Sequence, residues 1–310
     1  MFMVLGYPAP LLFGQLLLGL INGAFYALLS LGLAVIFGML NIVNFAHGAL
    51  FMMGAFVAWM ILTPNTWLAM IDPSLQVPAW LSIGYWPALI VAPIIVGLFG
   101  LLIERTIIRR LYGLDNIYGL LLTFGMALII EGLFRNAFGS SGQPYAIPPV
   151  LSGAVNLGFM FMPIYRGWVV VAALVVCLGT WLLIEKTPLG ARLRAATENA
   201  PLVQAFGVNV PRLVSLTFAG GVALAAFAGV LAAPIYSVNP GMGSSFIITV
   251  FAVVVIGGMG SILGSIVTGF GLGVVEGLTK VFYPQASATV IFVVMVIVLL
   301  ARPTGLFGRA

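Results

Sequence analysis

Charged residues are scarce in this sequence: Asp, Glu, Lys and Arg make up 6% of its 310 residues, and hydrophobic residues make up 62%. An average soluble domain has roughly 25% charged residues. Because so few charges cannot cover a water-facing surface, the composition excludes a soluble globular protein and predicts a polytopic membrane protein. The net charge of +5 comes from basic residues at the ends of apolar runs, so it does not indicate nucleic-acid binding.

Cysteine and histidine each occur once, as Cys177 and His47. Cys177 lies in an apolar run without a partner for an internal disulfide, so we interpret it as a packing residue. One histidine without a cluster of cysteines or carboxylates cannot supply the usual ligands of a metal, so no metal site is predicted. The sequence also lacks a Ser/His/Asp arrangement and a phosphate-binding glycine loop. We therefore predict no catalytic residues and no cofactor.

The apolar runs are long enough for helices that cross a membrane, which need about 20 residues for roughly 30 Å of hydrocarbon. We predict an all-α bundle of about nine spans, with eight to ten as the range, in one transmembrane domain over residues 1–310. The first span is long enough to tilt or break, and the seventh ends in a glycine-rich segment, 257–261, that predicts a tight turn or a break within the membrane. The predicted spans are residues 11–37, 45–62, 85–103, 118–138, 167–184, 213–233, 246–259, 262–280 and 288–301.

Basic residues are divided unevenly between the two sides of this bundle. With nine spans, one side carries Arg105, Arg109, Arg110, the stretch 186–212, Arg302 and Arg309, and the other side carries Arg135, Arg166 and Lys280. Positive charge marks the inner side of a membrane protein. We therefore predict that the N-terminus is outside and the C-terminus inside.

The acidic residues are placed near basic ones. Glu131 precedes Arg135 by four residues and Glu276 precedes Lys280 by four, so each acid can form an ion pair on its own helix. Three further acids are expected at the inner interface beside basic residues: Glu104, Glu185 and Glu198. On this interpretation no buried, unpaired carboxylate is left for a proton or sodium relay, which weakens the case for a secondary transporter.

One polar stretch, from Lys186 to Arg212, interrupts the apolar sequence. Its alanines favour a short helix from Arg192 to Phe206, in which Glu198 follows Arg194 by four residues. A charged helix between two spans suits docking onto a soluble partner. A loop that only sets the membrane topology is the simpler interpretation.

Uncharged polar residues are the remaining candidates for a functional site. Asn41, Asn44 and His47 lie close together at the start of the second predicted span, and Asn22 lies in the first. These side chains can hydrogen-bond to helix ends, or they can line a polar pathway. A scaffold with few polar groups, no energy-coupling chemistry of its own and an inner docking segment suggests the membrane subunit of a primary transporter.

Several motifs resemble the branched-chain amino acid ABC transporter permeases of the Liv type, and more closely the first of that system's two permeases. The resemblance extends from residue 11 to the closing segment 302–308. Its motifs are GLINGAFYAL at 19–28, LNIVNFAHGAL at 40–50, RAATEN at 194–199 with GVNV at 207–210, and IGGMGS at 256–261.

The resemblance implies an ABC importer in the cell inner membrane. In it the chain would pair with a second, homologous permease, two cytoplasmic ATP-binding subunits that hydrolyse ATP, and a periplasmic substrate-binding protein. The segment 192–207 would be the coupling helix, and the implied contacts with an ATPase are Arg192, Arg194, Glu198, Asn199 and Gly207. The implied substrate pathway lies near Asn22, Asn41, Asn44 and His47.

Two other classes of function stay open. One is a self-sufficient secondary carrier or facilitator for a small polar solute, and the other is a structural membrane subunit of an enzyme complex. Within the resemblance the substrate is open as well, because a separate binding protein would select among leucine, isoleucine, valine, other amino acids, urea and short amides.

Overall fold

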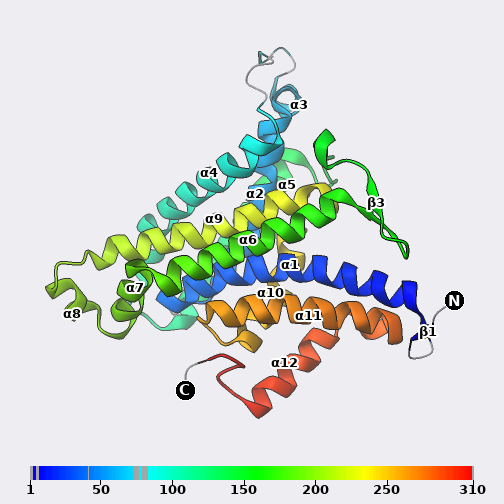
Figure 1. Cartoon of the computed structure of the whole chain (residues 1–310). Coiled ribbons are helices and arrows are strands. Elements are labelled where there is room, and N and C mark those ends of the chain that lie inside the picture. Colours follow the sequence, from blue (N-terminus) through cyan, green and yellow to red (C-terminus); the bar gives the residue numbers. More distant parts are fainter. Residues whose placement is uncertain are drawn as a thin grey trace. The chain divides into compact units, whose positions relative to one another are not determined.

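The structure is a computed structural model that describes residues 3–4, 7–40, 42–72, 74, 77–78 and 83–308. This part of the chain is mainly helical (Figure 1). The helices are α1 (Ala9–Leu40), α2 (Ala46–Leu62), α3 (Pro64–Ile71), α4 (Tyr85–Thr106), η2 (Ile108–Leu111), α5 (Asn116–Phe138), η3 (Pro149–Leu151), α6 (Ile164–Lys186), α7 (Pro188–Glu198), α8 (Ala200–Ala205), α9 (Val210–Tyr236), α10 (Met242–Gly257), α11 (Ile262–Phe282), η4 (Pro284–Ala286) and α12 (Val290–Ala301). Two antiparallel hairpins pair β1 (Met3–Val4) with β2 (Tyr7–Pro8) and β3 (Ala154–Asn156) with β4 (Phe161–Pro163).

Each predicted span contains a helix, which confirms the helical class. Within the described residues, six helices are long and apolar enough to cross a membrane: α1, α4 with η2, α5, α6, α9 and α11. The pair of α2 and α3 is bent by 102°, and α10 and α12 are shorter. At 1.5 Å per residue α12 covers only about 18 Å, less than the hydrocarbon thickness. The count of nine spans therefore stays a prediction.

The chain divides into two compact units. Unit 1 contains Met1–Leu40, Pro149–Leu213 and Ile248–Ala310. Unit 2 contains Asn41–Pro148 and Val214–Ile247.

In unit 1, α1 packs antiparallel to α11, and small residues hold the two helices close together. A Cβ atom added to Gly19 would lie 2.4 Å from the Gly273 carbonyl oxygen, and one added to Gly277 would lie 2.4 Å from the Gln15 oxygen. Side chains larger than hydrogen would force the backbones apart. Figure 1 shows the two helices, blue and orange, side by side. α1 is continuous, so its glycines serve close packing and not the break that its length allowed.

The β3–β4 hairpin and the closing segment lie at opposite ends of α1. Near the start of α1, the Phe13 ring lies 5.7 Å from the Phe159 ring between β3 and β4. In the last turn of α1, at its other end, a Cβ on Gly38 would lie 3.2 Å from Gly260. The closing segment binds beside Gly260, because the Leu306 N–H donates to the Ile256 oxygen at 2.8 Å.

Segment 257–261 forms a tight turn between α10 and α11. Gly258 and Gly260 have φ of +98° and +84°, in the left-handed region that favours glycine. The Ser261 N–H donates to the Gly258 oxygen at 2.9 Å, and its hydroxyl caps α11 by accepting from the Gly264 N–H at 3.1 Å. Of the two predicted alternatives, the local structure is a turn.

Unit 2 packs α2, α4 and α5 with the greater part of α9. A Cβ on Gly54 of α2 would lie 2.4 Å from Ala226 of α9. The Gln143 N–H, beyond α5, donates to the Val238 oxygen, beyond α9, at 2.7 Å. This bridge places the C-terminal ends of α5 and α9 at the same end of the unit.

Candidate functional site

The polar stretch 186–212 forms two helices, α7 and α8, in unit 1. The prediction of a single helix from Arg192 to Phe206 was therefore wrong. Asn199 has φ −149° and ψ 85°, outside the helical region, and its side chain accepts from the Leu202 N–H at 3.0 Å as the cap of α8. Pro201 has no N–H with which to continue a hydrogen-bonded helix from α7. We call residues 188–207 the coupling segment.

The charged residues of the coupling segment differ in their contacts. The Arg194 guanidinium donates to the Ile184 oxygen at 3.2 Å and pairs with Glu185 at 3.3 Å, so it binds α6 and not Glu198. Arg192 and Glu198 are exposed, as are Asn199 and Gly207. Of the predicted contact residues, Arg194 therefore holds α7 on the end of α6, and the other four are accessible.

Two apolar residues of this segment were missed in the sequence. Leu202 is 53% exposed and Phe206 is 80% exposed. Val203, between them, is buried. Large exposed side chains in an otherwise polar connection are typical of anchors for a partner protein.

A second candidate site lies in unit 2, where the chain enters α2. Residues 42–44 are not helical, and the Phe45 N–H donates to the Thr123 hydroxyl of α5 at 3.1 Å. Asn44 is 1% exposed, and neither atom of its side-chain amide has a hydrogen-bond partner among the described residues. His47 is fully buried, and its backbone N–H donates to the Asn44 backbone carbonyl oxygen at 3.2 Å. Asn41 lies outside the described residues.

An irregular, polar backbone next to a membrane helix is tolerated where it is buried in protein or lines a cavity. A buried amide without a partner costs free energy, so a chain keeps one where it serves another purpose. Of the two predicted roles for Asn44, its side chain does not perform the helix cap among the described residues, and the polar pathway stays a prediction.

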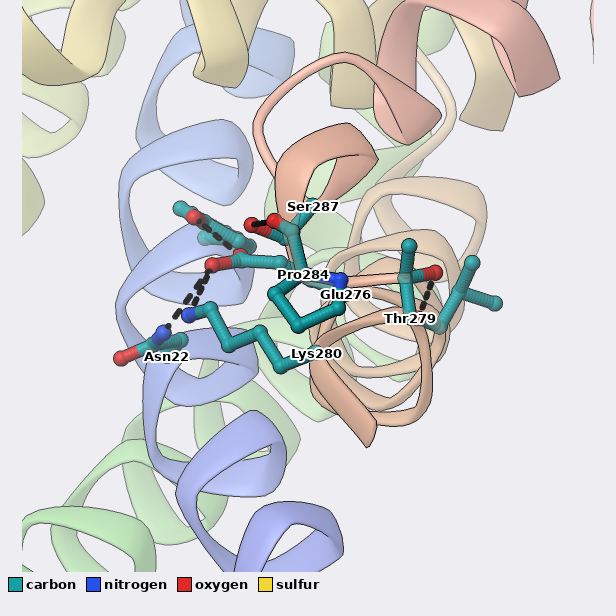
Figure 2. Close-up of polar contacts among 8 residues, drawn as sticks. Asn22, Glu276, Thr279, Lys280, Pro284 and Ser287 are labelled. Atoms are coloured by element: carbon teal, nitrogen blue, oxygen red, sulfur yellow. Dashed lines mark hydrogen bonds and ion pairs between the residues drawn. The ribbon is translucent and has the colours of Figure 1, made fainter. Parts of the chain in front are cut away.

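The fourth predicted pathway residue, Asn22, lies in unit 1 and belongs to a different group of side chains. Its amide donates to Glu276 Oε1 at 3.4 Å, and Lys280 Nζ pairs with the same oxygen at 2.5 Å (Figure 2). The Tyr26 hydroxyl donates to Glu276 Oε2 at 2.7 Å. We call these four residues the α1–α11 polar cluster. The predicted pair of Glu276 and Lys280 is confirmed, and Asn22 and Tyr26 add donors that the sequence did not indicate.

Comparison with known proteins identifies this architecture. The family model described as "Branched-chain amino acid transport system / permease component" matches residues 15–300. The chain belongs to this family. The permease protein BraD of the high-affinity branched-chain amino acid transport system of Pseudomonas aeruginosa is 33% identical over 307 residues, covering 95% of both chains.

The family is represented in other bacteria and in an archaeon. The permease protein LivH of Salmonella typhimurium is 30% identical over 302 residues, covering 95% of both chains. A probable LivH of Methanocaldococcus jannaschii is 29% identical over 300 residues, covering 91% of this chain and 88% of the relative. No solved structure matched the chain. The protein is thus a multi-pass membrane permease component.

One carboxylate in this permease corrects the expectation that no buried, unpaired acid is left. Glu104 is fully buried, and it accepts from the Ser215 hydroxyl of α9 at 2.5 Å and from the Tyr112 hydroxyl at 2.7 Å. No salt bridge to Glu104 is present in the described part of the chain. Burial, followed by the hydrogen bond to Glu104, raises the pKa of Tyr112 above its ordinary value. A buried, unpaired carboxylate therefore does exist, and it joins α4 to the first turns of α9.

Proposed function

We propose that this permease is the membrane subunit of an ABC importer for branched-chain amino acids in the cell inner membrane. It works with a second, homologous permease, two cytoplasmic ATP-binding subunits and a periplasmic substrate-binding protein. The observation that carries the proposal is the family match over residues 15–300, together with relatives named for this transport. ATP hydrolysis resides in the partners, and the permease itself is not an enzyme.

The proposed orientation places the N-terminus outside and the C-terminus inside. Unit 1 supports it, because α1 starts beside the β3–β4 hairpin and the closing segment binds at its far end. Termini at opposite ends require an odd number of crossings, as nine spans provide. The coupling segment follows α6, which starts directly after the same hairpin and so runs toward the C-terminal side.

The coupling segment, within the cytoplasmic loop 186–212, is the proposed contact with an ATP-binding subunit. Leu202 and Phe206 supply apolar anchors, and Arg192, Glu198, Asn199 and Gly207 surround them with accessible polar groups and backbone. Arg194 acts from within, because its bonds to Ile184 and Glu185 transmit a push on α7 to the end of α6.

The proposed substrate pathway passes the irregular segment before α2. Asn44 offers an amide donor and an amide acceptor that are not used by the described residues, and His47 lies one turn further into the buried helix. An amide of this kind can hydrogen-bond both to a carboxylate and to an ammonium group. Asn41 belongs to the same proposed pathway by its place in the sequence.

The proposal is tested by purification of the tagged permease in mild detergent and by uptake in proteoliposomes. Phe206→Ala is expected to reduce recovery of the ATP-binding subunits, while Phe307→Ala, which removes an exposed phenylalanine outside the coupling segment, leaves recovery unchanged. The wild-type complex should show ATP-dependent uptake of leucine. Recovery of the chain alone with ATP-independent uptake would favour a secondary carrier.

A further inference from the structure

The α1–α11 polar cluster contains an ammonium group whose donors are only partly used. The Lys280 ammonium carries three N–H donors. Within the described part of the chain, Glu276 is its one hydrogen-bond partner. The Lys280 side chain is 35% exposed, so the other donors can reach a further group.

The carboxylate beside it is in the opposite situation. Glu276 accepts from Lys280, Asn22 and Tyr26, and its side chain is 11% exposed. Figure 2 shows Asn22 and Lys280 approaching the same carboxylate from different helices. Because Asn22 and Tyr26 donate to Glu276 as well, the carboxylate does not depend on Lys280 alone. The carboxylate is therefore mostly buried and held by three donors, whereas the ammonium group is the more exposed member of the pair and can reach a further acceptor.

The place of Lys280 in the fold agrees with an anion that arrives from outside. It lies in the last turn of α11, which packs antiparallel to α1, so it is near the start of α1. The proposed orientation makes this end the outer one. Charged residues within membrane helices usually mark a pathway and not a lipid-facing surface.

We infer that Lys280 forms an outer subsite for a carboxylate, and that it receives the α-carboxylate of an amino acid at the start of its passage. The inference rests on the proposed function. Glu276, with Asn22 and Tyr26 behind it, is a positioning residue that holds the ammonium in place. The bond formed is a charge-assisted hydrogen bond between an ammonium and a carboxylate.

The competing explanation is that Lys280 only neutralises Glu276. The two explanations differ in a variant that removes both charges, Glu276→Gln/Lys280→Gln. Two amides can still hydrogen-bond to each other and to Tyr26 and Asn22, so a purely structural role needs no lysine in this background. A carboxylate subsite does need it.

The experiment measures initial rates of leucine uptake by proteoliposomes that contain the complete importer, with leucine-loaded binding protein outside. We expect Lys280→Gln to slow uptake about tenfold or more, as for loss of one hydrogen bond to a charged group. The double variant should be as slow, and Lys280→Arg should recover most of the rate. Each complex is first shown to be monodisperse, so that a misfolded variant is not counted.

Uptake at the wild-type rate by the double variant would overturn the subsite while leaving the importer function intact, and so would an unchanged rate for Lys280→Gln. Absence of ATP-dependent leucine uptake by the wild-type complex would overturn the proposed function, and with it the amino acid carboxylate as the ligand of Lys280. The two failures are thus distinguished by the wild-type measurement.

Discussion

The close contact between α1 and α11 allows a matched pair of substitutions on one helix. A Cβ atom on Gly273 would lie 2.4 Å from the Gly19 oxygen and 2.4 Å from Gly23, both of them backbone atoms of α1. A Cβ on Gly271, two residues earlier, would meet nothing within 4 Å. Gly273→Ala and Gly271→Ala therefore add the same methyl group to α11, once into a backbone and once into open space.

The magnitude follows from two terms. Alanine is a better helix former than glycine by about 1 kcal/mol, and this gain applies to both variants. Ordinary contact needs roughly 1 Å more room than the Gly273 site provides, and overpacking of this kind costs about 1–3 kcal/mol. Because the helix term cancels, Gly273→Ala should be less stable than Gly271→Ala by about 1–3 kcal/mol.

The assay is the free energy of unfolding from SDS titration in mixed micelles, with leucine uptake measured on the same preparations. We expect Gly271→Ala to match or exceed the wild-type stability and Gly273→Ala to fall below it. Equal unfolding midpoints for the two variants would show that α1 and α11 are not packed as closely as described.

Three further predictions concern buried polar groups. Glu104→Gln should lower the free energy of unfolding by about 1–3 kcal/mol, because the hydroxyls of Ser215 and Tyr112 lose the carboxylate that accepts from them. Glu185→Gln, at an exposed ion pair, should change the free energy of unfolding by less than about 1 kcal/mol. Similar losses for the two variants in the same SDS titration would contradict this prediction. Burial raises the pKa of Tyr112, so its folded phenol stays neutral while the unfolded one ionises near pH ~10; its contribution to stability is present below that pH and lost above it. Titrations of tyrosine absorbance in the folded wild-type protein and in Tyr112→Phe should then show the same change near pH ~10, because Tyr112 does not ionise there. Asn44→Leu should stabilise the fold by about 1–3 kcal/mol, since it removes a buried amide that has no partner among the described residues. The same variant should slow leucine uptake. A stabilised variant with full uptake would show that Asn44 is not part of the pathway.

Local features of the sequence predicted local structure well. The pairs Glu131–Arg135 and Glu276–Lys280 both form, at 2.5 Å, because residues four apart face each other on any helix. The apolar runs became helices for a similar reason, since a chain in hydrocarbon must satisfy its own backbone hydrogen bonds.

Contacts between distant segments were not predictable in this way. Glu104 finds Ser215, which is 111 residues away, and Arg194 prefers Glu185 on the preceding helix to the nearer Glu198. Such partners depend on which helices pack together, and the spacing along one helix does not contain that information. The break at Asn199 was not predictable from helix propensity either, because it ends the expected single helix and places Phe206 at the C-terminal end of a separate short helix.

The hydrogen bonds of the closing segment bear on how the protein is made. The carbonyl groups of Ile256 and Gly257 at the end of α10 accept from Leu306 and Phe307, which the ribosome adds only after α11 and α12. The end of α10 therefore gains these partners only after residues 306 and 307 have been added. Chains that stop short of residue 306 should therefore leave the Ile256 and Gly257 carbonyl groups without these two partners.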